Sequence, residues 1–314
     1  MRQAECLHQD ARHRVTLFRA PEGSRRAVVC FEPGRDRMQG FEPTSCPRFA
    51  ERLGIDALTV QTARRDWFVS GRSAALARAL TQATAGYDEV TATGFSMGGY
   101  GALLYSKAAH VCRALVVSPQ YCIDPQVAPY DPGRHAKFAR IGRAMPLPES
   151  QGDTGLVGVL LYDPAIPEDR AHAARIGAAF PHLRLIALPH GGHPATGVIG
   201  DANGIGAIST MLIRGQLNAA RIRSLHRDAR RGSVRYRLSL AHAALPRHPD
   251  RALAMLAQIA RTAPPQQRLE ACLTLLPLDP ATGTAALSKL LEDVPDPPPG
   301  WARRIGRALA EVPD

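Results

Sequence analysis

Residues 89–102 decide the fold of this chain of 314 residues, and they read Glu89-Val90-Thr91-Ala92-Thr93-Gly94-Phe95-Ser96-Met97-Gly98-Gly99-Tyr100-Gly101-Ala102. A β-branched, apolar run leads into Gly94, and an apolar helical pattern follows Ser96. The centre of the stretch is Gly-x-Ser-x-Gly, whose glycines permit a sharp turn from a strand into a helix. Larger side chains at Gly94 and Gly98 would collide with each other or with a neighbouring strand. Ser96 is therefore expected at the carboxyl end of a strand and the N-terminus of a helix.

Short apolar runs alternate with helical patterns on both sides of this stretch. Several runs lack polar alternation, which is typical of parallel strands covered on both faces. Strands are expected at residues 15–18, 27–31, 57–61, 89–93, 114–118, 157–162 and 183–188, and helices at 73–84, 98–109, 168–180 and 205–217. This alternation predicts a doubly wound, mostly parallel α/β domain over residues 1–218.

The strand signal disappears in the last third of the chain, so residues 219–314 are expected to form a small all-α appendage. Leu245-Pro246-Arg247-His248-Pro249 and Leu276-Pro277-Leu278-Asp279-Pro280 start 31 residues apart, and each precedes an Ala/Leu-rich helical pattern, at 251–260 and 284–291. This weak repeat resembles helical hairpins of the tetratricopeptide kind. A chance match between two Ala-rich helices is the alternative. If the repeat is genuine, the tail offers a surface for a protein partner.

Composition and charge limit the possible classes. The 45% hydrophobic and 21% charged residues are ordinary for a globular protein and exclude disordered, collagenous and disulfide-scaffold classes. The net charge of +11 raises the question of nucleic-acid binding, but only three of the 39 basic residues are lysine, a skew that coding bias also produces. Residues 214–237 contain eight arginines and one acid, Asp228, with Tyr236 as the only aromatic residue that could stack on a base. A solvated helix face explains this stretch better, so nucleic acid is not an expected partner.

Cysteine spacing and hydropathy bear on the compartment. The six cysteines show no Cys-x-x-Cys spacing, and no run of 18 apolar residues occurs. We therefore expect neither a metal site nor a disulfide framework, no membrane span, and a cytoplasmic location.

A serine hydroxyl is a weak nucleophile, so Ser96 needs a base and a group that orients the base. The run at 156–162 leads directly into Asp163, which places this carboxylate at the end of a strand. Asp169 is the competing acid, although its position suits the first turn of a helix. The next strand ends in Pro189-His190-Gly191-Gly192-His193-Pro194. His193 follows the glycine pair on a loop that could reach the serine, whereas His190 lies closer to the strand end and is the alternative.

At these residues the sequence resembles the α/β-hydrolase family, and the segment 94–103 is similar to that of esterase-D-like serine esterases. The resemblance covers residues 15–216. It implies that Ser96 is the nucleophile, His193 the general base and Asp163 the orienting carboxylate. It also implies that the backbone N–H of Met97 donates to the oxyanion, with a second donor on the loop after an early strand. Pro33 in that loop has no N–H, so Glu32 is the expected second donor.

The resemblance implies a serine hydrolase that cleaves an ester or thioester of a small-molecule acyl substrate through an acyl-enzyme on Ser96, without a cofactor. The 35 or so residues of 119–155 lack a strand pattern and lie where this family often inserts a lid. Two alternatives remain open. One is an acyltransferase that uses the same three residues, and the other is a non-catalytic scaffold that recruits partners through the helical tail.

Overall fold

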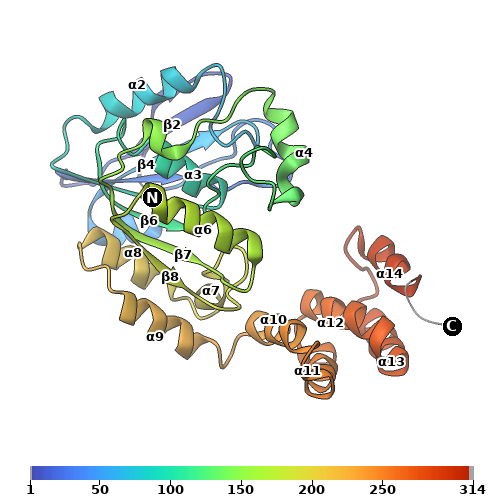
Figure 1. Ribbon diagram of the computed structural model, residues 1–314. Coiled ribbons are helices and arrows are strands. Elements are labelled where there is room, and N and C mark those ends of the chain that lie inside the picture. The colour runs from blue at the N-terminus through green and yellow to red at the C-terminus, as the bar shows by residue number, and fades with distance from the viewer. Residues whose placement is uncertain (1, 311–314) are drawn as a thin grey trace. The chain divides into compact units, whose positions relative to one another are not determined.

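The computed structural model describes residues 2–310, and a single sheet of eight strands organises the first two thirds of the chain (Figure 1). The strands lie in the order β1-β2-β4-β3-β5-β6-β7-β8. β2 is antiparallel to β1 and β4, and the other pairs are parallel. The bounds are β1 (Ala4–Gln9), β2 (His13–Phe18), β3 (Arg26–Phe31), β4 (Asp56–Thr62), β5 (Glu89–Phe95), β6 (Val111–Val117), β7 (Val157–Tyr162) and β8 (Leu183–Ala187). This arrangement confirms the predicted α/β-hydrolase fold class.

Helices cover both faces of the sheet. Alternate strand residues point to opposite faces, so Leu160 belongs to an apolar cluster with the helices at residues 73–84, 97–104 and 167–179, and its neighbour Leu161 to a second cluster with those at 48–53, 205–213 and 219–229. The helices of this part are α1 (Arg48–Leu53), α2 (Ser73–Thr84), α3 (Met97–Leu104), α4 (Pro132–Ile141), α5 (Pro148–Gln151), α6 (Pro167–Ala179), α7 (Gly197–Asp201), α8 (Ile205–Ile213) and α9 (Ala219–Ala229). Two apolar layers therefore fix the sheet and hold the carboxyl ends of its parallel strands in register.

The seven strands expected from the sequence are all present, but β1 was missed. Its side chains are exposed or half-buried, so it lacks the apolar signal of a core strand. The expected helix at 73–84 has the observed bounds, whereas those expected at 98–109 and 205–217 end earlier, at Leu104 and Ile213.

The chain divides into two compact units, residues 1–227 and 228–314. The division falls later than residue 218 because α9 packs on the first unit, with Ile222 fully buried and Leu225 against the same cluster. The second unit contains α10 (Val234–Ala244), α11 (Pro249–Thr262), α12 (Pro265–Leu278), α13 (Pro280–Asp293) and α14 (Trp301–Leu309). Its core is a separate cluster that includes Leu256, Leu275 and Leu290. The unit is helical as expected, and the internal repeat stays a prediction.

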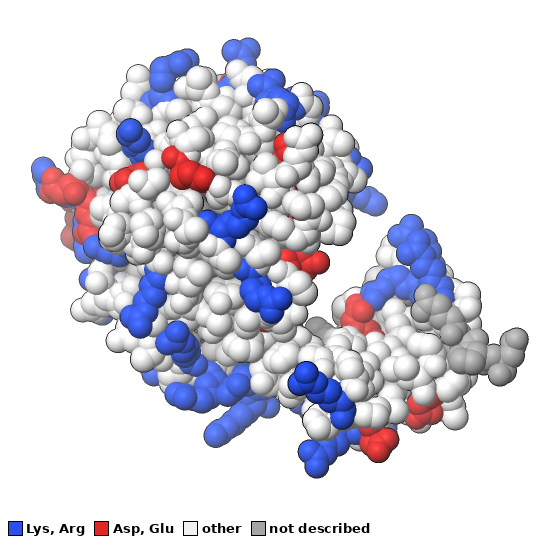
Figure 2. Space-filling model, in the orientation of Figure 1, with Lys and Arg blue, Asp and Glu red and all other residues white. Residues whose placement is uncertain are grey.

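The surface charge is spread over the visible face (Figure 2), and no helix among the described residues is suited to crossing a membrane. Lys and Arg side chains lie in several separate groups on the visible face, divided by uncharged surface (Figure 2). Within residues 2–310, no helix is both long and apolar enough to cross a membrane.

Truncating Ile222 tests how firmly α9 belongs to the first unit. We expect Ile222→Ala to lower the free energy of unfolding by about 2–5 kcal/mol, because it removes a fully buried side chain and leaves a cavity. Arg223→Ala is the matched control, since Arg223 is the next residue of α9 and is exposed. Urea unfolding followed by circular dichroism measures both. Equal stability of the two variants would show that α9 does not pack on the sheet.

Candidate active site

The turn between β5 and α3 is as sharp as the glycine pattern predicts. Ser96 has φ 51° and ψ −118°, a backbone conformation that residues other than glycine rarely adopt. A Cβ atom on Gly94 would lie 2.1 Å from the carbonyl oxygen of Gly98, and one on Gly98 would lie 2.4 Å from that of Phe31. The backbone N–H of Ser96 donates to the carbonyl of Val117 at 2.8 Å. These contacts hold Ser96 at the carboxyl edge of the sheet.

His193 lies on the loop after β8 and joins Ser96 to an acid. Its Nε2 is 2.9 Å from the Ser96 hydroxyl oxygen, and its Nδ1 is 2.9 and 3.0 Å from the two carboxylate oxygens of Asp169. A carboxylate accepts only, so Nδ1 carries the proton and donates it to Asp169. The lone pair of Nε2 then faces the serine hydroxyl. The Asp169 side chain is 1% exposed and that of His193 is 26% exposed, so the acid is shielded while the histidine can be reached by solvent.

The carboxylate beside His193 is Asp169, and the expected pairing of His193 with Asp163 is wrong. Asp163 accepts hydrogen bonds from the backbone N–H groups of Ala165 at 2.9 Å, His190 at 3.0 Å and Gly192 at 2.8 Å. It therefore shapes the loop that carries both histidines. The expected position at a strand end was correct, but the carboxylate turns toward the backbone, while Asp169 projects inward from the first turn of α6. His190, the alternative base, contributes its backbone N–H to Asp163.

The two expected oxyanion donors differ in availability. The N–H of Met97 is at the first position of α3 and makes no backbone hydrogen bond within residues 2–310. The N–H of Glu32 donates to the carbonyl of Val60 at 3.0 Å, because pairing between β3 and β4 continues one residue beyond β3. Its carboxylate accepts the N–H of Thr62 at 2.6 Å, and burial raises the pKa of this carboxyl. The expectation that Glu32 supplies a free N–H is therefore wrong.

Gln120 is a second polar contact of Ser96 that the sequence did not reveal. Its Nε2 lies 3.2 Å from the Ser96 hydroxyl oxygen and 3.2 Å from the carbonyl of Ser118. Its Oε1 accepts the indole N–H of Trp67 at 3.0 Å, which fixes the orientation of the amide. The Gln120 side chain is fully buried. A buried amide N–H thus points to the serine from the end of β6.

Segment 119–155 contains α4 and α5, and α4 brings a cation to the site. Arg134 Nη2 lies 3.3 Å from His193 Nε2, and Arg134 Nη1 donates to Asp131 Oδ2 at 2.8 Å. The same oxygen of Asp131 is 2.9 Å from His172 Nε2, on α6. Asp131 and His172 are both buried, so they form a fixed anchor for the Arg134 side chain.

The protonation of this anchor follows from its contacts. The backbone N–H of Tyr121 donates to His172 Nδ1 at 3.1 Å, which requires a lone pair there and places the ring proton on Nε2. Burial by itself would raise the pKa of Asp131, but hydrogen bonds from His172 and Arg134 outweigh it and hold the pKa below its ordinary value. Asp131 is therefore ionised at neutral pH and balances the charge of Arg134.

Sequence signals for the missed residues were unequal. Gln120 follows the predicted strand 114–118 almost directly, so its position at a strand end was a usable signal. Arg134 and Asp131 lie in a segment without a clear pattern, and Arg134 is one of many arginines. No group of three or more His, Cys, Asp or Glu side chains arranged to hold a metal ion occurs in the described part of the chain.

Comparisons with known proteins give low sequence similarity. No protein-family model and no curated protein matches the chain. An esterase of Pyrococcus furiosus is 12% identical, with 69% of this chain and 92% of that chain covered and a TM-score of 0.47. Est1E from Butyrivibrio proteoclasticus is 13% identical, with 66% and 98% covered and a TM-score of 0.42. The capsule O-acetyltransferase of Neisseria meningitidis serogroup A is 13% identical, with 65% and 92% covered and a TM-score of 0.46. At these TM-scores the similarities carry no argument about function.

Asp163 is expected to stabilise the histidine loop, and this can be measured directly. Asp163→Ala removes the acceptor of three backbone N–H groups at a site that is 1% exposed, so we expect a loss of about 2–4 kcal/mol in unfolding free energy. Asp153→Ala is the control, because Asp153 is exposed and accepts one backbone N–H, from Gly155. We expect the control to lose less than about 1 kcal/mol. Similar losses in both variants would contradict the structural role of Asp163.

Proposed function

We propose that the first unit is a serine hydrolase that cleaves an ester or thioester through an acyl-enzyme on Ser96. The observation that carries this proposal is the unbroken sequence of hydrogen bonds from Asp169 to His193 to Ser96. Each contact is 2.9–3.0 Å long, and the serine stands on a strained turn at the carboxyl edge of the sheet. A hydroxyl, a base and an orienting acid in this order are what nucleophilic catalysis by serine requires.

The reaction follows from the proton positions. Ser96 Oγ attacks the carbonyl carbon while its proton passes to His193 Nε2. The bond to the leaving alcohol or thiol then breaks, and His193 returns the proton to that group. Water repeats the sequence on the acyl-enzyme: His193 takes its proton, the hydroxyl adds to the carbonyl, and Ser96 leaves and regains a proton. Asp169 stabilises the charged imidazole in both halves without taking a proton.

Two donors are available for the oxyanion in this proposal. The N–H of Met97 lies at the start of α3, where the helix dipole also favours negative charge. The amide of Gln120 is buried and held by Trp67, so little reorganisation is needed when charge develops. These two groups replace the expected pair of Met97 and Glu32.

Two other functions remain as alternatives. An acyltransferase would use the same residues and exclude water in favour of another acceptor. A scaffold that recruits proteins through the helical unit would not need Ser96 and His193 at hydrogen-bond distance, so the geometry favours an enzyme. Hydrolase and transferase are separated by comparing the products formed in water alone with those formed in water that contains an added alcohol or amine as acyl acceptor.

Labelling by a fluorophosphonate probe tests the nucleophile. We expect the full chain to be labelled covalently, and Ser96→Ala to lose both labelling and hydrolysis of an activated ester, because the attacking oxygen is removed. Ser288→Ala is the control, since Ser288 is an exposed serine on α13 of the second unit, and we expect it to keep both labelling and hydrolysis. Persistent labelling of the Ser96→Ala protein would overturn the assignment.

The acid is tested by comparing two conservative changes. We expect Asp169→Asn to lower kcat on the order of a thousandfold, because the amide cannot hold the His193 tautomer or balance its charge. Asp163→Asn should lower the melting temperature and lower kcat much less than Asp169→Asn does, because the contacts described for Asp163 are all to loop backbone. Both quantities are measured on both proteins. If Asp163→Asn loses kcat at unchanged stability while Asp169→Asn stays active, the roles are reversed.

A further inference from the structure

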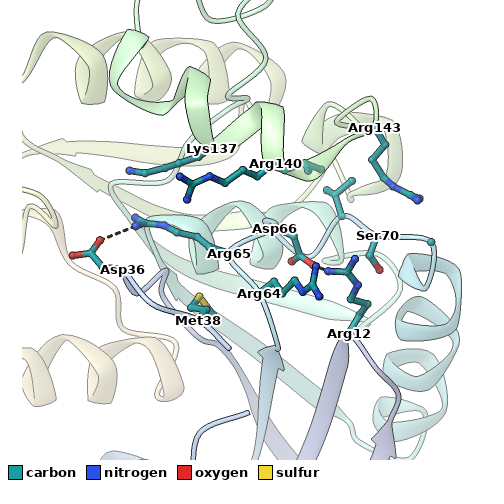
Figure 3. Close-up of a pocket in the computed structure, with 13 residues that line it drawn as sticks. Arg12, Asp36, Met38, Arg64, Arg65, Asp66, Ser70, Lys137, Arg140 and Arg143 are labelled. Carbon is teal, nitrogen blue, oxygen red and sulfur yellow. Dashed lines mark hydrogen bonds and ion pairs between the residues drawn. The ribbon is translucent and has the colours of Figure 1, made fainter. Parts of the chain in front are cut away.

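A cavity of about 500 Å³ opens beside the candidate active site and is lined by cations. Lys137 and Arg140 extend into it from α4, and arginines from the chain before β2 and after β4 face them (Figure 3). The cationic side chains are Arg12, Arg64, Arg65, Lys137, Arg140 and Arg143. Met38 and Val69, which are 7% and 5% exposed, add apolar surface to the wall. The volume is in the range of small-molecule sites.

The positive charge of this cavity is mostly unbalanced. Of its two acids, Asp66 lies 3.9 Å from Arg12, and Asp36 lies 3.0 Å from Arg65 with its own side chain fully exposed. Among residues 2–310, no ion pair is found for Arg64, Lys137, Arg140 or Arg143; Lys137 is half-buried and the three arginines are exposed at the rim. Burial lowers the pKa of Lys137, and the charges of Arg65 and Arg134 lower it further. Six cations facing two acids still repel one another on balance, and a bound anion would reduce that repulsion.

The cavity adjoins the Ser96 site along two lines of contact. Arg134 and Lys137 are three residues apart on α4, and Arg134 reaches His193. On the other side, the Arg65 guanidinium lies 5.8 Å from the centre of the Trp67 ring, and Trp67 donates to Gln120, which contacts Ser96. The cavity is thus connected to the Ser96 site through α4 on one side and through Trp67 and Gln120 on the other.

The Nη2 group of Arg134, which faces His193, lacks a good hydrogen-bond acceptor. Its Nη2 and the Ser96 hydroxyl both face the single Nε2 lone pair of His193, so both hydrogen bonds cannot be strong at once. An anionic group of the substrate would be a better partner for Arg134, and it would free the lone pair for the serine proton.

We propose that the basic cavity binds the phosphate groups of an acyl substrate, an ester or thioester whose leaving group carries phosphate. This inference rests on the proposed function for the acyl step, whereas the anion site stands on the cavity itself. Arg and Lys donors suit phosphate oxygens, and the concave shape suits a small molecule better than a long polyanion.

Calorimetric titration of the full chain with pyrophosphate tests the anion site without any reaction. We expect binding that weakens by about tenfold or more in the double variant Lys137→Gln/Arg140→Gln. The matched control is Arg214→Gln/Arg223→Gln, which removes the same charge from exposed positions of the first unit outside the cavity, and should change the affinity less than about twofold. No binding, equal loss in both double variants, or binding of RNA without binding of pyrophosphate would overturn the site.

Kinetics with a matched pair of thioesters tests the substrate class. Acetyl coenzyme A carries phosphates, and S-acetyl-N-acetylcysteamine presents the same thioester without them. We expect a higher kcat/KM for the phosphate-bearing compound, and at least about a tenfold fall in this preference in Lys137→Gln/Arg140→Gln but not in the control. Hydrolysis of both thioesters with no preference would overturn the substrate class and leave the hydrolase. Pyrophosphate binding at the cavity without hydrolysis of either thioester, and without fluorophosphonate labelling, would instead count against the hydrolase.

Discussion

The close approach of the backbone at Gly94 to that at Gly98 is the constraint on which the rest of the site depends. No side chain fits between the two, so the chain leaves β5 and enters α3 within a few residues. Ser96, at the apex, accepts an unfavourable φ that the hydrogen bond from its N–H to Val117 helps to maintain. The hydroxyl is thereby presented at the edge where the loops after β6, β7 and β8 converge. A larger residue at either glycine would move Ser96 away from His193.

The division of work between two acids shows how that edge is organised. Asp163 uses its carboxylate to hold the backbone of the loop after β8, and Asp169 uses its own to hold the His193 ring. Asp163 follows β7 directly, where N–H groups of the loop after β8 reach it, whereas Asp169 stands in the first turn of α6 and faces the ring. α6 also carries His172, three residues after Asp169, which anchors Asp131 and through it Arg134. One helix therefore positions both the acid beside the histidine and the cation of segment 119–155.

Local features of the amino-acid sequence were sufficient to predict the fold class. They also identified Ser96 and His193, two of the three residues linked by hydrogen bonds at the site. Apolar runs located the core strands, and the Gly-x-Ser-x-Gly pattern located the turn, because both depend on neighbours in sequence. The choice between Asp163 and Asp169 depended on which carboxylate points at a ring 24 residues from Asp169, and a strand end gives no information about that direction. The prediction for Glu32 was wrong for a similar reason, since its N–H makes one more hydrogen bond between the chain after β3 and β4, to the carbonyl of Val60. The position of Gln120 near a strand end was a usable signal, whereas Arg134 contacts the site through tertiary packing alone.

The many arginines of this chain fall into two groups, those paired with an acid and those that are not. Arg113 is paired with Glu89 at 2.8 Å and Arg268 with Asp293 at 2.8 Å, so these cations are balanced within their own units. Coding bias or surface solvation accounts for such residues without any ligand. Arg134 is also balanced on one side by Asp131, yet its other amino group faces a base that must keep its lone pair for Ser96. Lys137 and Arg140 follow Arg134 on α4 and line a concave surface, and no ion pair of theirs is found among residues 2–310. Six cations converge on one concave surface that holds only two acids, and this local excess of positive charge is the physical reason to connect the cavity with the chemistry at Ser96.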